Sequence, residues 1–300
     1  MEWQQILGFY HVVKLQSFTR AAEATGRSQS ALSQQIKALE EEFECRLIER
    51  TGKRNLRLTL QGEIFFNFAE SVVRGSRQCR ESLEVSKESG RGRLRIAAPF
   101  TTLYHLLPEA VKQFMTELPQ VELTLLDRPQ SVVVDLVRSA DVDFGLALEK
   151  AAPRELATLR WKEVETVVIA PSGHPLCSLQ PVSLEHLAQY PLILPPKGVE
   201  HAGRILLEEQ FRKMDIDYRV IMESSNVELS SMYVEMGLGI TCASLVRGLP
   251  RLSSRKLTFL SLGHIFNPEF LCLITRKDKT RSLAMQAFVQ LLFQNEREEI

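Results

Sequence analysis

The stretch SFTRAAEATGRSQSALSQQIKALEEE, residues Ser17–Glu42, contains two short amphipathic segments separated by one glycine. Ser17 and Ser28 each come directly before an apolar-periodic segment, and serine is a preferred residue at the N-cap of a helix. Gly26 lies between the segments and can adopt the left-handed conformation that ends one helix and begins a sharp turn. Two short helices joined by such a turn predict a helix-turn-helix.

The second predicted helix carries a polar face on which no acidic residue occurs before Glu40. Gln and Ser side chains can hydrogen-bond to base edges and Lys can reach phosphate, so this face fits the major groove of DNA. A helix whose polar face is merely solvated would show the same residues, so this stretch alone leaves both interpretations open. The candidate DNA contacts on this helix are Ser28, Gln29, Ser30, Ser33, Gln34 and Lys37.

A basic segment follows the second helix. Leu47-Ile48 and Leu56–Leu58 have the character of short strands, with Thr51-Gly52 at the turn between them. This pattern predicts a wing, a hairpin whose cations contact phosphate or the minor groove beside the recognition helix. A solvated charged loop is the alternative, and the position directly after the helix favours a DNA contact. The candidate cations are Arg50, Lys53, Arg54 and Arg57.

The run SFTRAAEATGRSQSALSQQIKALEEEFECRLIER, residues 17–50, and the segment LTLQGEIFF, residues 58–66, resemble the N-terminal third of LysR-type transcriptional regulators. The resemblance implies a winged helix-turn-helix, a long helix and an effector-binding domain. Three positions depart from the family pattern. Thr25 stands where the family usually has an apolar residue, Ser30 replaces a common proline, and Glu44 replaces the usual glycine at the end of the recognition helix.

A long helix is predicted from Thr59, the expected N-cap, to Ser89, because this segment lacks proline. Its apolar residues at 65, 68, 72, 79 and 83 recur at nearly seven-residue spacing, which favours pairing with the same helix of a second subunit over burial in one small domain. The net charge of the chain is 0, so one subunit should bind DNA modestly, and a dimer or a tetramer would multiply that affinity. Residues 90–92, Gly-Arg-Gly, predict a hinge.

Predicted strands and helices alternate over residues 93–300, beginning with a strand at 94–98 and a single helix over 103–118. This order predicts a mainly parallel sheet with helices on both faces. A second unit of the same kind follows, and the last strand and helix return to the first. Two such α/β lobes predict a periplasmic-binding-protein-like (type 2) effector domain, which the LysR resemblance also implies. The predicted organisation is a winged helix-turn-helix domain at 1–58, a linker helix at 59–89, and an effector domain at 90–300 with lobe I at about 90–163 and 268–300 and lobe II at about 164–267.

Ligands of such sheets bind at the carboxyl ends of strands and at the N-termini of helices. That rule selects Pro99–Thr102 in the first lobe, where hydroxyl and backbone N–H groups can hold a carboxylate or another anion, and residues 197–201 in the second. Helix capping alone would also explain the threonines. The expected effector contacts are Phe100, Thr101, Thr102, Ser131, Ala147, Leu148, Gly198, Val199, His201 and Asn226.

The segments APFTTLYHLLP, residues 98–108, and IFNPEFLCLITRK, residues 265–277, faintly resemble the sulfur-assimilation regulators within the LysR family. That subgroup has a polar, Thr-rich loop after the first strand, whereas Ala98, Pro99 and Phe100 make this loop largely apolar. We therefore do not carry over its effector and expect an organic acid with an apolar body equally well.

Other classes of protein receive little support. The five cysteines are scattered, odd in number and form no Cys-x-x-Cys pair, so neither a disulfide framework nor a zinc site is predicted, while a redox role for one cysteine stays open. No Gly-x-Ser-x-Gly elbow or nucleotide-binding glycine loop occurs, so we expect neither an enzyme nor a cofactor. No signal peptide or membrane-spanning run occurs, which predicts a cytoplasmic protein.

The sequence therefore predicts a ligand-responsive transcription factor whose partners are promoter DNA and a second copy of itself, paired through residues 59–89. A dimer of dimers is the expected assembly, and RNA polymerase is a candidate partner. The rival interpretation is a cytoplasmic small-molecule-binding protein without direct DNA regulation, which would leave the N-terminal 90 residues without a role.

Overall fold

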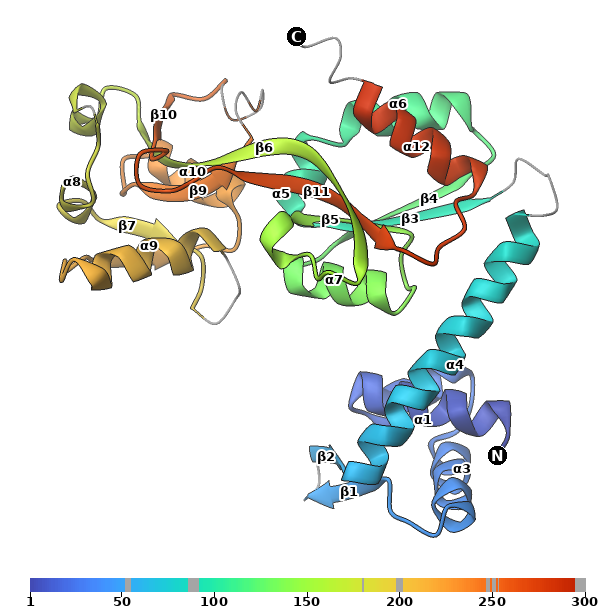
Figure 1. Cartoon of the computed structure of the whole chain (residues 1–300). Coiled ribbons are helices and arrows are strands. Elements are labelled where there is room, and N and C mark those ends of the chain that lie inside the picture. Colours follow the sequence, from blue (N-terminus) through green and yellow to red (C-terminus); the bar gives the residue numbers. More distant parts are fainter. Residues whose placement is uncertain are drawn as a thin grey trace. The chain divides into compact units, whose positions relative to one another are not determined.

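The computed structural model describes residues 1–51, 55–85, 92–179, 181–197, 202–246, 249, 252 and 254–294. The chain divides into two compact units, Met1–Lys87 and Glu88–Ile300 (Figure 1). Several of the predicted site residues lie outside the described residues, as do residues 90 and 91 of the predicted hinge. They are Lys53, Arg54, Gly198, Val199 and His201.

The first unit contains helices and a two-stranded hairpin. Ser17 caps its helix by accepting a hydrogen bond from the Arg20 N–H, Ser28 accepts one from the Ala31 N–H, and Gly26 has a φ of 64°. The predicted helix-turn-helix is therefore confirmed, and so is the hairpin that follows it. The elements are α1 (Trp3–Leu15), α2 (Phe18–Thr25), α3 (Gln29–Glu42), β1 (Ile48–Thr51), β2 (Asn55–Leu58) and α4 (Leu60–Val85).

Helix α3 ends normally although Glu44 replaces the glycine that the LysR pattern leads one to expect. Glu44 has a φ of 49°, in the left-handed region that glycine favours. The Cys45 N–H then donates to the Glu40 carbonyl at 3.1 Å, which is the hydrogen bond of a Schellman motif. The cap therefore forms with a residue other than glycine, at some cost in backbone strain.

The start of α4 lies against the end of the loop before β1. The Thr59 hydroxyl accepts a hydrogen bond from the Gly62 N–H at 2.9 Å and donates to the Arg46 carbonyl at 2.6 Å, so Thr59 is the N-cap as predicted. A Cβ atom on Gly62 would lie 2.0 Å from the Leu47 carbonyl oxygen. Glycine is therefore required at this position by the close approach of two backbones.

The second unit is built on a seven-stranded sheet with the order β10-β6-β11-β5-β3-β4, in which β9 also pairs with β6. Strand β3 pairs in parallel with β4 and β5, whereas β11 is antiparallel to β5 and β6. The predicted mainly parallel sheet is therefore wrong, because the last strand inserts between β5 and β6 in the opposite direction. The strands are β3 (Arg93–Ala98), β4 (Glu122–Asp127), β5 (Phe144–Leu148), β6 (Leu156–Pro171), β9 (Thr241–Leu245), β10 (Leu257–Ser261) and β11 (Glu269–Arg276).

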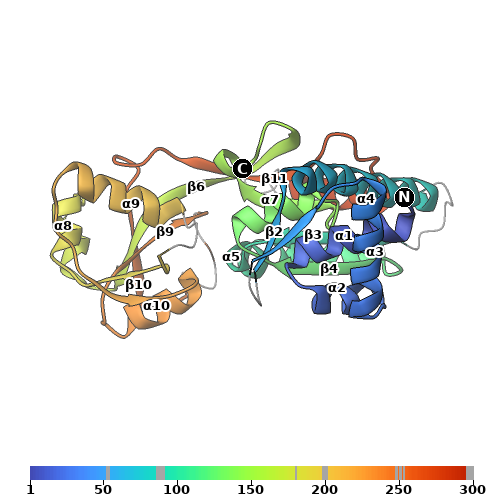
Figure 2. The same ribbon diagram turned by 90° about the horizontal axis from the view of Figure 1, so that it is seen from below.

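Strand β6 is long enough to belong to two lobes (Figures 1 and 2). Its first part, up to Val164, pairs with β11, and its second part, from Glu165, pairs with β9 and β10. Each lobe has a core of its own, which contains Phe114, Phe144 and Phe288 in lobe I and Leu194 and Phe211 in lobe II.

Lobe I contains α5 (Phe100–His105), α6 (Pro108–Glu117), α7 (Gln130–Arg138) and α12 (Leu283–Gln294), with the short 3-10 turn η1 (Glu149–Ala151). Lobe II contains η2 (Pro175–Ser178), α8 (Leu184–Ala188), α9 (Ala202–Lys213), α10 (Val227–Glu235) and the parallel pair β7 (Leu192–Leu194) and β8 (Val220–Glu223).

The single helix predicted over 103–118 is wrong, because the chain forms α5 and α6 instead. Pro108 is the first residue of α6, where its missing N–H would have no partner in any case. The break leaves α5 as a separate short helix directly after β3, and this helix carries several residues of the site described below.

The close approach at Gly62 predicts that Gly62→Ala destabilises the first unit by about 1–3 kcal/mol or more, because the backbones of α4 and Leu47 must separate. The matched control is Gly75→Ala in the same helix, where an added Cβ meets nothing within 4 Å. The control should stabilise the helix by about 0.5–1 kcal/mol. Urea unfolding followed by circular dichroism measures the free energy of unfolding of both variants. Equal effects of the two substitutions would contradict the steric requirement for glycine at position 62.

Candidate functional site

The outward face of α3 carries the predicted DNA contacts. Leu32, Ile36 and Leu39 are buried in the core of the unit, which leaves the opposite side of the helix exposed. The amide groups of Gln29 and Gln34 are exposed and make no hydrogen bond with any described residue. Two uncommitted amides, one at the first residue of the helix and one about a turn and a half further on, are therefore available to base edges.

The remaining predicted contacts on α3 are partly engaged within the chain. The Ser28 hydroxyl caps the helix and lies 2.9 Å from the hydroxyl of the exposed Ser30. The Lys37 ammonium lies 3.3 Å from the Glu41 carboxylate, and both side chains are largely exposed. Such a surface ion pair contributes little to the stability of the protein, so Lys37 can exchange Glu41 for a phosphate at a small cost in free energy. Ser33 is half-buried.

The wing places a cation on the strand that returns to α4. Arg57 is exposed on β2, opposite Glu49 in the register of the hairpin. Arg50 lies on β1, and its side chain is outside the described part of the structure.

Glu40, which the sequence indicated only as the end of the polar face, connects α3 to the wing. One carboxylate oxygen accepts hydrogen bonds from the Leu47 N–H at 2.8 Å and the Ile48 N–H at 3.2 Å, and the other lies 3.1 Å from the Arg46 guanidinium. The Glu40 side chain is 11% exposed. It therefore fixes the start of β1 against α3, and no local signal in the sequence reveals this contact.

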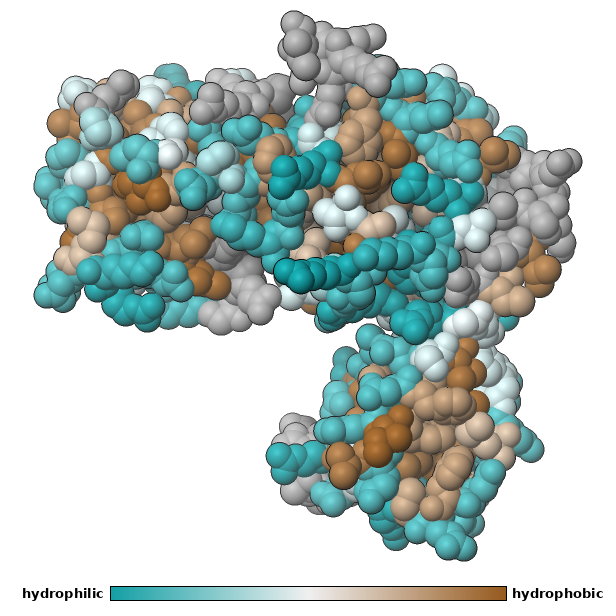
Figure 3. Space-filling model, in the orientation of Figure 1, coloured by the Kyte–Doolittle hydropathy of each residue, from teal (hydrophilic) through white to brown (hydrophobic). Residues whose placement is uncertain are grey.

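An apolar stripe runs along the exposed side of α4. Leu60, Ile64 and Phe68 are 71%, 65% and 41% exposed and follow one another at four-residue spacing, so they share one face of the helix. Figure 3 shows apolar residues along the visible side of this unit. The predicted stripe is wrong at Phe65 and Val72, because both side chains pack in the core of their own unit.

A cavity of about 420 Å3 lies between the two lobes of the second unit. Its walls come from the carboxyl ends of β3, β4 and β5 in lobe I and from the segments that follow β7 and β8, with β9, in lobe II. This is the position that the strand-end rule predicts. The lining includes five of the predicted effector contacts, which are Phe100, Thr101, Thr102, Leu148 and Asn226.

Two further predicted contacts, Ser131 and Ala147, lie outside the lining. Successive residues of a strand face opposite sides of a sheet, so when Leu148 lines the cavity, Ala147 packs on the other face against α7. Ser131 is exposed, and the residue before it, Gln130, lines the cavity and accepts a hydrogen bond from the Leu148 N–H at 2.8 Å.

The charged groups that line the cavity differ in how fully they are paired. Arg204 is 4% exposed and donates to the Glu208 and Glu223 carboxylates, and its hydrogen bond lowers the pKa of Glu223 below the ordinary value. Arg128 is exposed, donates one hydrogen bond to the Asp127 carbonyl, and forms no ion pair with the described residues. Arg128 is therefore a cation in the wall whose charge is available to a ligand.

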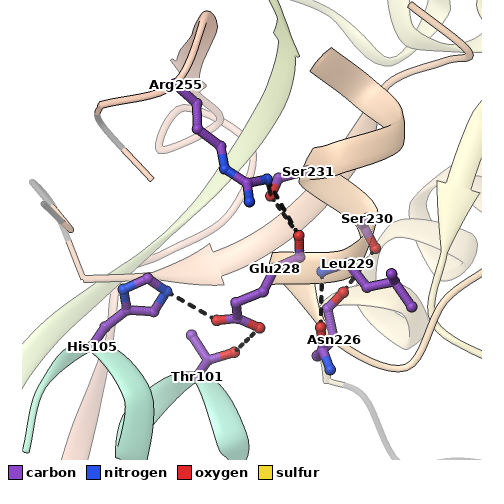
Figure 4. Close-up of polar contacts among 8 residues, drawn as sticks. All are labelled: Thr101, His105, Asn226, Glu228, Leu229, Ser230, Ser231 and Arg255. Atoms are coloured by element: carbon purple, nitrogen blue, oxygen red, sulfur yellow. Dashed lines mark hydrogen bonds and ion pairs between the residues drawn. The ribbon is translucent and has the colours of Figure 1, made fainter. Parts of the chain in front are cut away.

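The two threonines that were predicted to hold an anion differ as well, and Figure 4 shows Thr101 beside the Glu228 carboxylate. The Thr101 hydroxyl donates a hydrogen bond to the Glu228 carboxylate of lobe II at 3.2 Å. The Thr102 hydroxyl makes no hydrogen bond with the described residues, although the side chain is only 7% exposed. An anion in the cavity can therefore use Thr102 directly, whereas Thr101 is already bound to a carboxylate of the protein.

Cys242 also lines the cavity. Burial raises the pKa of its thiol to about 12 and, in lobe I, that of Cys272 to about 11, so both remain protonated at neutral pH. All five cysteines are free thiols, and no cluster of metal-binding side chains occurs among the described residues. Within the same described ranges, no helix has the length and apolar character needed to cross a membrane.

Comparison with known proteins gives matches over nearly the whole chain. Residues 3–63 match the bacterial regulatory helix-turn-helix protein, lysR family, and residues 87–297 match the LysR substrate binding domain. The regulator CysB of Burkholderia cenocepacia is 28% identical over 92% of this chain and 86% of its own length. The RuBisCO operon transcriptional regulator of Allochromatium vinosum is 31% identical over 95% of this chain and 93% of its own length.

Solved structures give the same fold. A cysteine variant of full-length OxyR from Pseudomonas aeruginosa matches with a TM-score of 0.67 at 22% identity, over 97% of each chain. Full-length CbnR in complex with its target DNA matches with a TM-score of 0.59 at 18% identity, over 98% of this chain and 99% of that one. With its helix-turn-helix, its two-lobed α/β unit and these matches, the chain belongs to the LysR family of transcriptional regulators.

Proposed function

We propose that this LysR-family regulator reads promoter DNA with α3 and the wing, and that a small molecule in the cavity between the lobes changes those DNA contacts. The observation that carries the proposal is the exposed, uncommitted amide pair of Gln29 and Gln34 on a helix followed directly by a basic hairpin. Amide side chains can form two hydrogen bonds to adenine, and cations of a wing contact phosphate. The proposed contacts are Ser28, Gln29, Ser30, Ser33, Gln34, Lys37, Arg50, Lys53, Arg54 and Arg57.

The exposed stripe of α4 supports pairing of two subunits. Leu60, Ile64 and Phe68 expose apolar surface along one side of a long helix, and a second copy of the helix is the natural partner for such a stripe. We assign DNA reading to residues 1–58, subunit pairing to 59–89 and effector binding to 90–300. Dimers would read a two-fold symmetric site, and two dimers would form the tetramer.

The cavity favours a small molecule with an apolar body and one anionic group. Phe100, Leu148 and Leu245 supply apolar wall, and Arg128 with the Thr102 hydroxyl supplies partners for an anion. We further propose that the protein acts in the cytoplasm, where promoter DNA is found and where RNA polymerase is a candidate partner. A small-molecule-binding protein without DNA regulation is disfavoured by the helix-turn-helix match over residues 3–63.

Gln34→Ala should cost roughly 1–3 kcal/mol on the specific DNA site and little on random DNA, because the amide reads a base. Arg57→Gln should weaken binding to every duplex alike and reduce the salt dependence by about one phosphate contact. Gln120→Ala, at an exposed turn of the other unit, is the control. Fluorescence titrations at several salt concentrations measure all three variants. Equal losses on both DNAs for Gln34→Ala would mean that the residue only positions the helix.

Ile64→Glu should convert the protein to monomers and strongly reduce its DNA affinity. The side chain is 65% exposed in the single chain, so the charge leaves the subunit folded but is buried when two helices pair. Arg80→Glu, at an exposed position on the opposite side of the same helix, changes the charge by two units rather than one and should leave the dimer intact. Light scattering measures the mass of each variant, and a dimeric Ile64→Glu protein would rule out this stripe as the interface.

Arg128→Gln should raise the Kd of the effector by about tenfold or more, because a charge-assisted hydrogen bond contributes about 1.5–3 kcal/mol. The ligand is found by a thermal-shift screen of aromatic and aliphatic carboxylates and phosphates against the full-length protein. Arg138→Gln is the control, since Arg138 lies on α7 and pairs with Glu155 at the surface. Equal Kd values for the wild type and Arg128→Gln would place the anionic group elsewhere.

A further inference from the structure

Two helices from different lobes meet at one carboxylate. Helix α5 of lobe I contributes Thr101 and His105, and helix α10 of lobe II contributes Glu228. The Thr101 hydroxyl donates to Oε2 of Glu228 at 3.2 Å, and Nε2 of His105 lies 3.0 Å from Oε1. Figure 4 shows the three side chains converging from the two ribbons.

This contact is largely removed from water. The side chain of His105 is 1% exposed and that of Glu228 is 14% exposed. Nε2 of His105 and Oε1 of Glu228 are buried and lie 3.0 Å apart, although neither forms a directed hydrogen bond with the described residues. A buried carboxylate and a buried imidazole that have few other partners hold each other, because separating them would leave both uncompensated.

Glu228 is held in place within lobe II independently of lobe I. It lies in the first turn of α10, where the positive end of the helix dipole favours a carboxylate. The Asn226 side chain caps that helix by accepting from the Leu229 N–H at 2.9 Å, and the Arg255 guanidinium donates to the Ser231 hydroxyl at 3.0 Å. The carboxylate is thus presented to α5 by a well-anchored turn.

We propose that Glu228 is an intramolecular anion that latches the two lobes together by occupying the corner formed by Thr101 and His105. The sequence indicated Thr101 for an external anion, and Thr101 lines the cavity. A carboxylate ligand that bound Thr101 would have to displace Glu228 and so release α5 from α10. A ligand that bound at Arg128 instead would leave the latch closed. The latch therefore determines which anionic ligands open the lobes and which stabilise them.

The cross-lobe nature of the contact gives a specific test by hydrogen exchange of the full-length protein, measured by mass spectrometry without DNA or effector. Glu228→Ala lies in lobe II and removes the acceptor of the Thr101 hydroxyl, so it should speed exchange at the α5 amides of Leu103 and Leu106 in lobe I. Thr101→Val lies in lobe I but should speed exchange at the α10 amides of Leu229 and Ser230. We expect increases of at least about fivefold, the factor that corresponds to the loss of one hydrogen bond.

Exchange in β3, β5 and β11 should stay unchanged in both variants, which shows that the lobes remain folded. Glu109→Ala, on the exposed surface of α6, is the matched control and should change neither helix. An effect confined to the helix that carries each substitution, or no effect in either helix, would overturn the latch. The role of the latch in the effector response rests on the proposed function, but this readout does not, so a failure of DNA binding and a failure of the latch are distinguishable.

Discussion

The second unit depends on the continuity of a single strand through two hydrophobic cores. Strand β6 pairs with β11 as far as Val164 and with β9 and β10 from Glu165 onward, so one backbone ladder serves both lobes. The chain crosses between the lobes again between β10 and β11. These crossings leave the facing ends of the lobes free to line a cavity, and the contact of Glu228 with α5 connects the lobes at a further point.

In the first unit, burial of one side of α3 determines which of its side chains are exposed. Because Leu32, Ile36 and Leu39 must enter the core, Gln34 is turned outward, whereas Gln29 is exposed as the first residue of α3. Two contacts with the backbone at the start of β1 then fix the position of the wing relative to α3 and α4. They are the acceptance of two N–H groups by Glu40 and the approach of Gly62 to the Leu47 carbonyl. The proposed DNA face is thus held in position from its inner side, as base readout requires.

Most of the correctly predicted elements depend on interactions between residues that are close in the sequence. Ser17, Gly26, Ser28 and Thr59 act on residues within three or four positions, so caps and turns could be predicted from the sequence, and their hydrogen bonds confirm them. The strand-end rule likewise located the cavity because it depends only on chain direction in a sheet. The same rule applied to the end of β4 would also have selected Asp127 and Arg128, which line the cavity.

Contacts between distant residues could not be predicted in this way. The insertion of β11 next to β5 and β6 has no sequence signature, and it made the sheet mixed. Thr101 and Glu228 are 127 positions apart, so nothing near either residue indicated that a threonine expected to bind a ligand would bind a carboxylate of the protein. Whether Ala147 or Leu148 lines the cavity depends on which face of the sheet each side chain of β5 points to. That alternation is set by packing on both faces of the sheet.

The most direct test of this account is selection of DNA by the full-length protein from a random pool, followed by sequencing of the bound fraction. If two subunits paired through α4 each present α3 and a wing, the enriched DNA should contain two half-sites related by two-fold symmetry, as dimeric helix-turn-helix proteins require. Enrichment of a single asymmetric site, or no enrichment over the starting pool, would contradict the account.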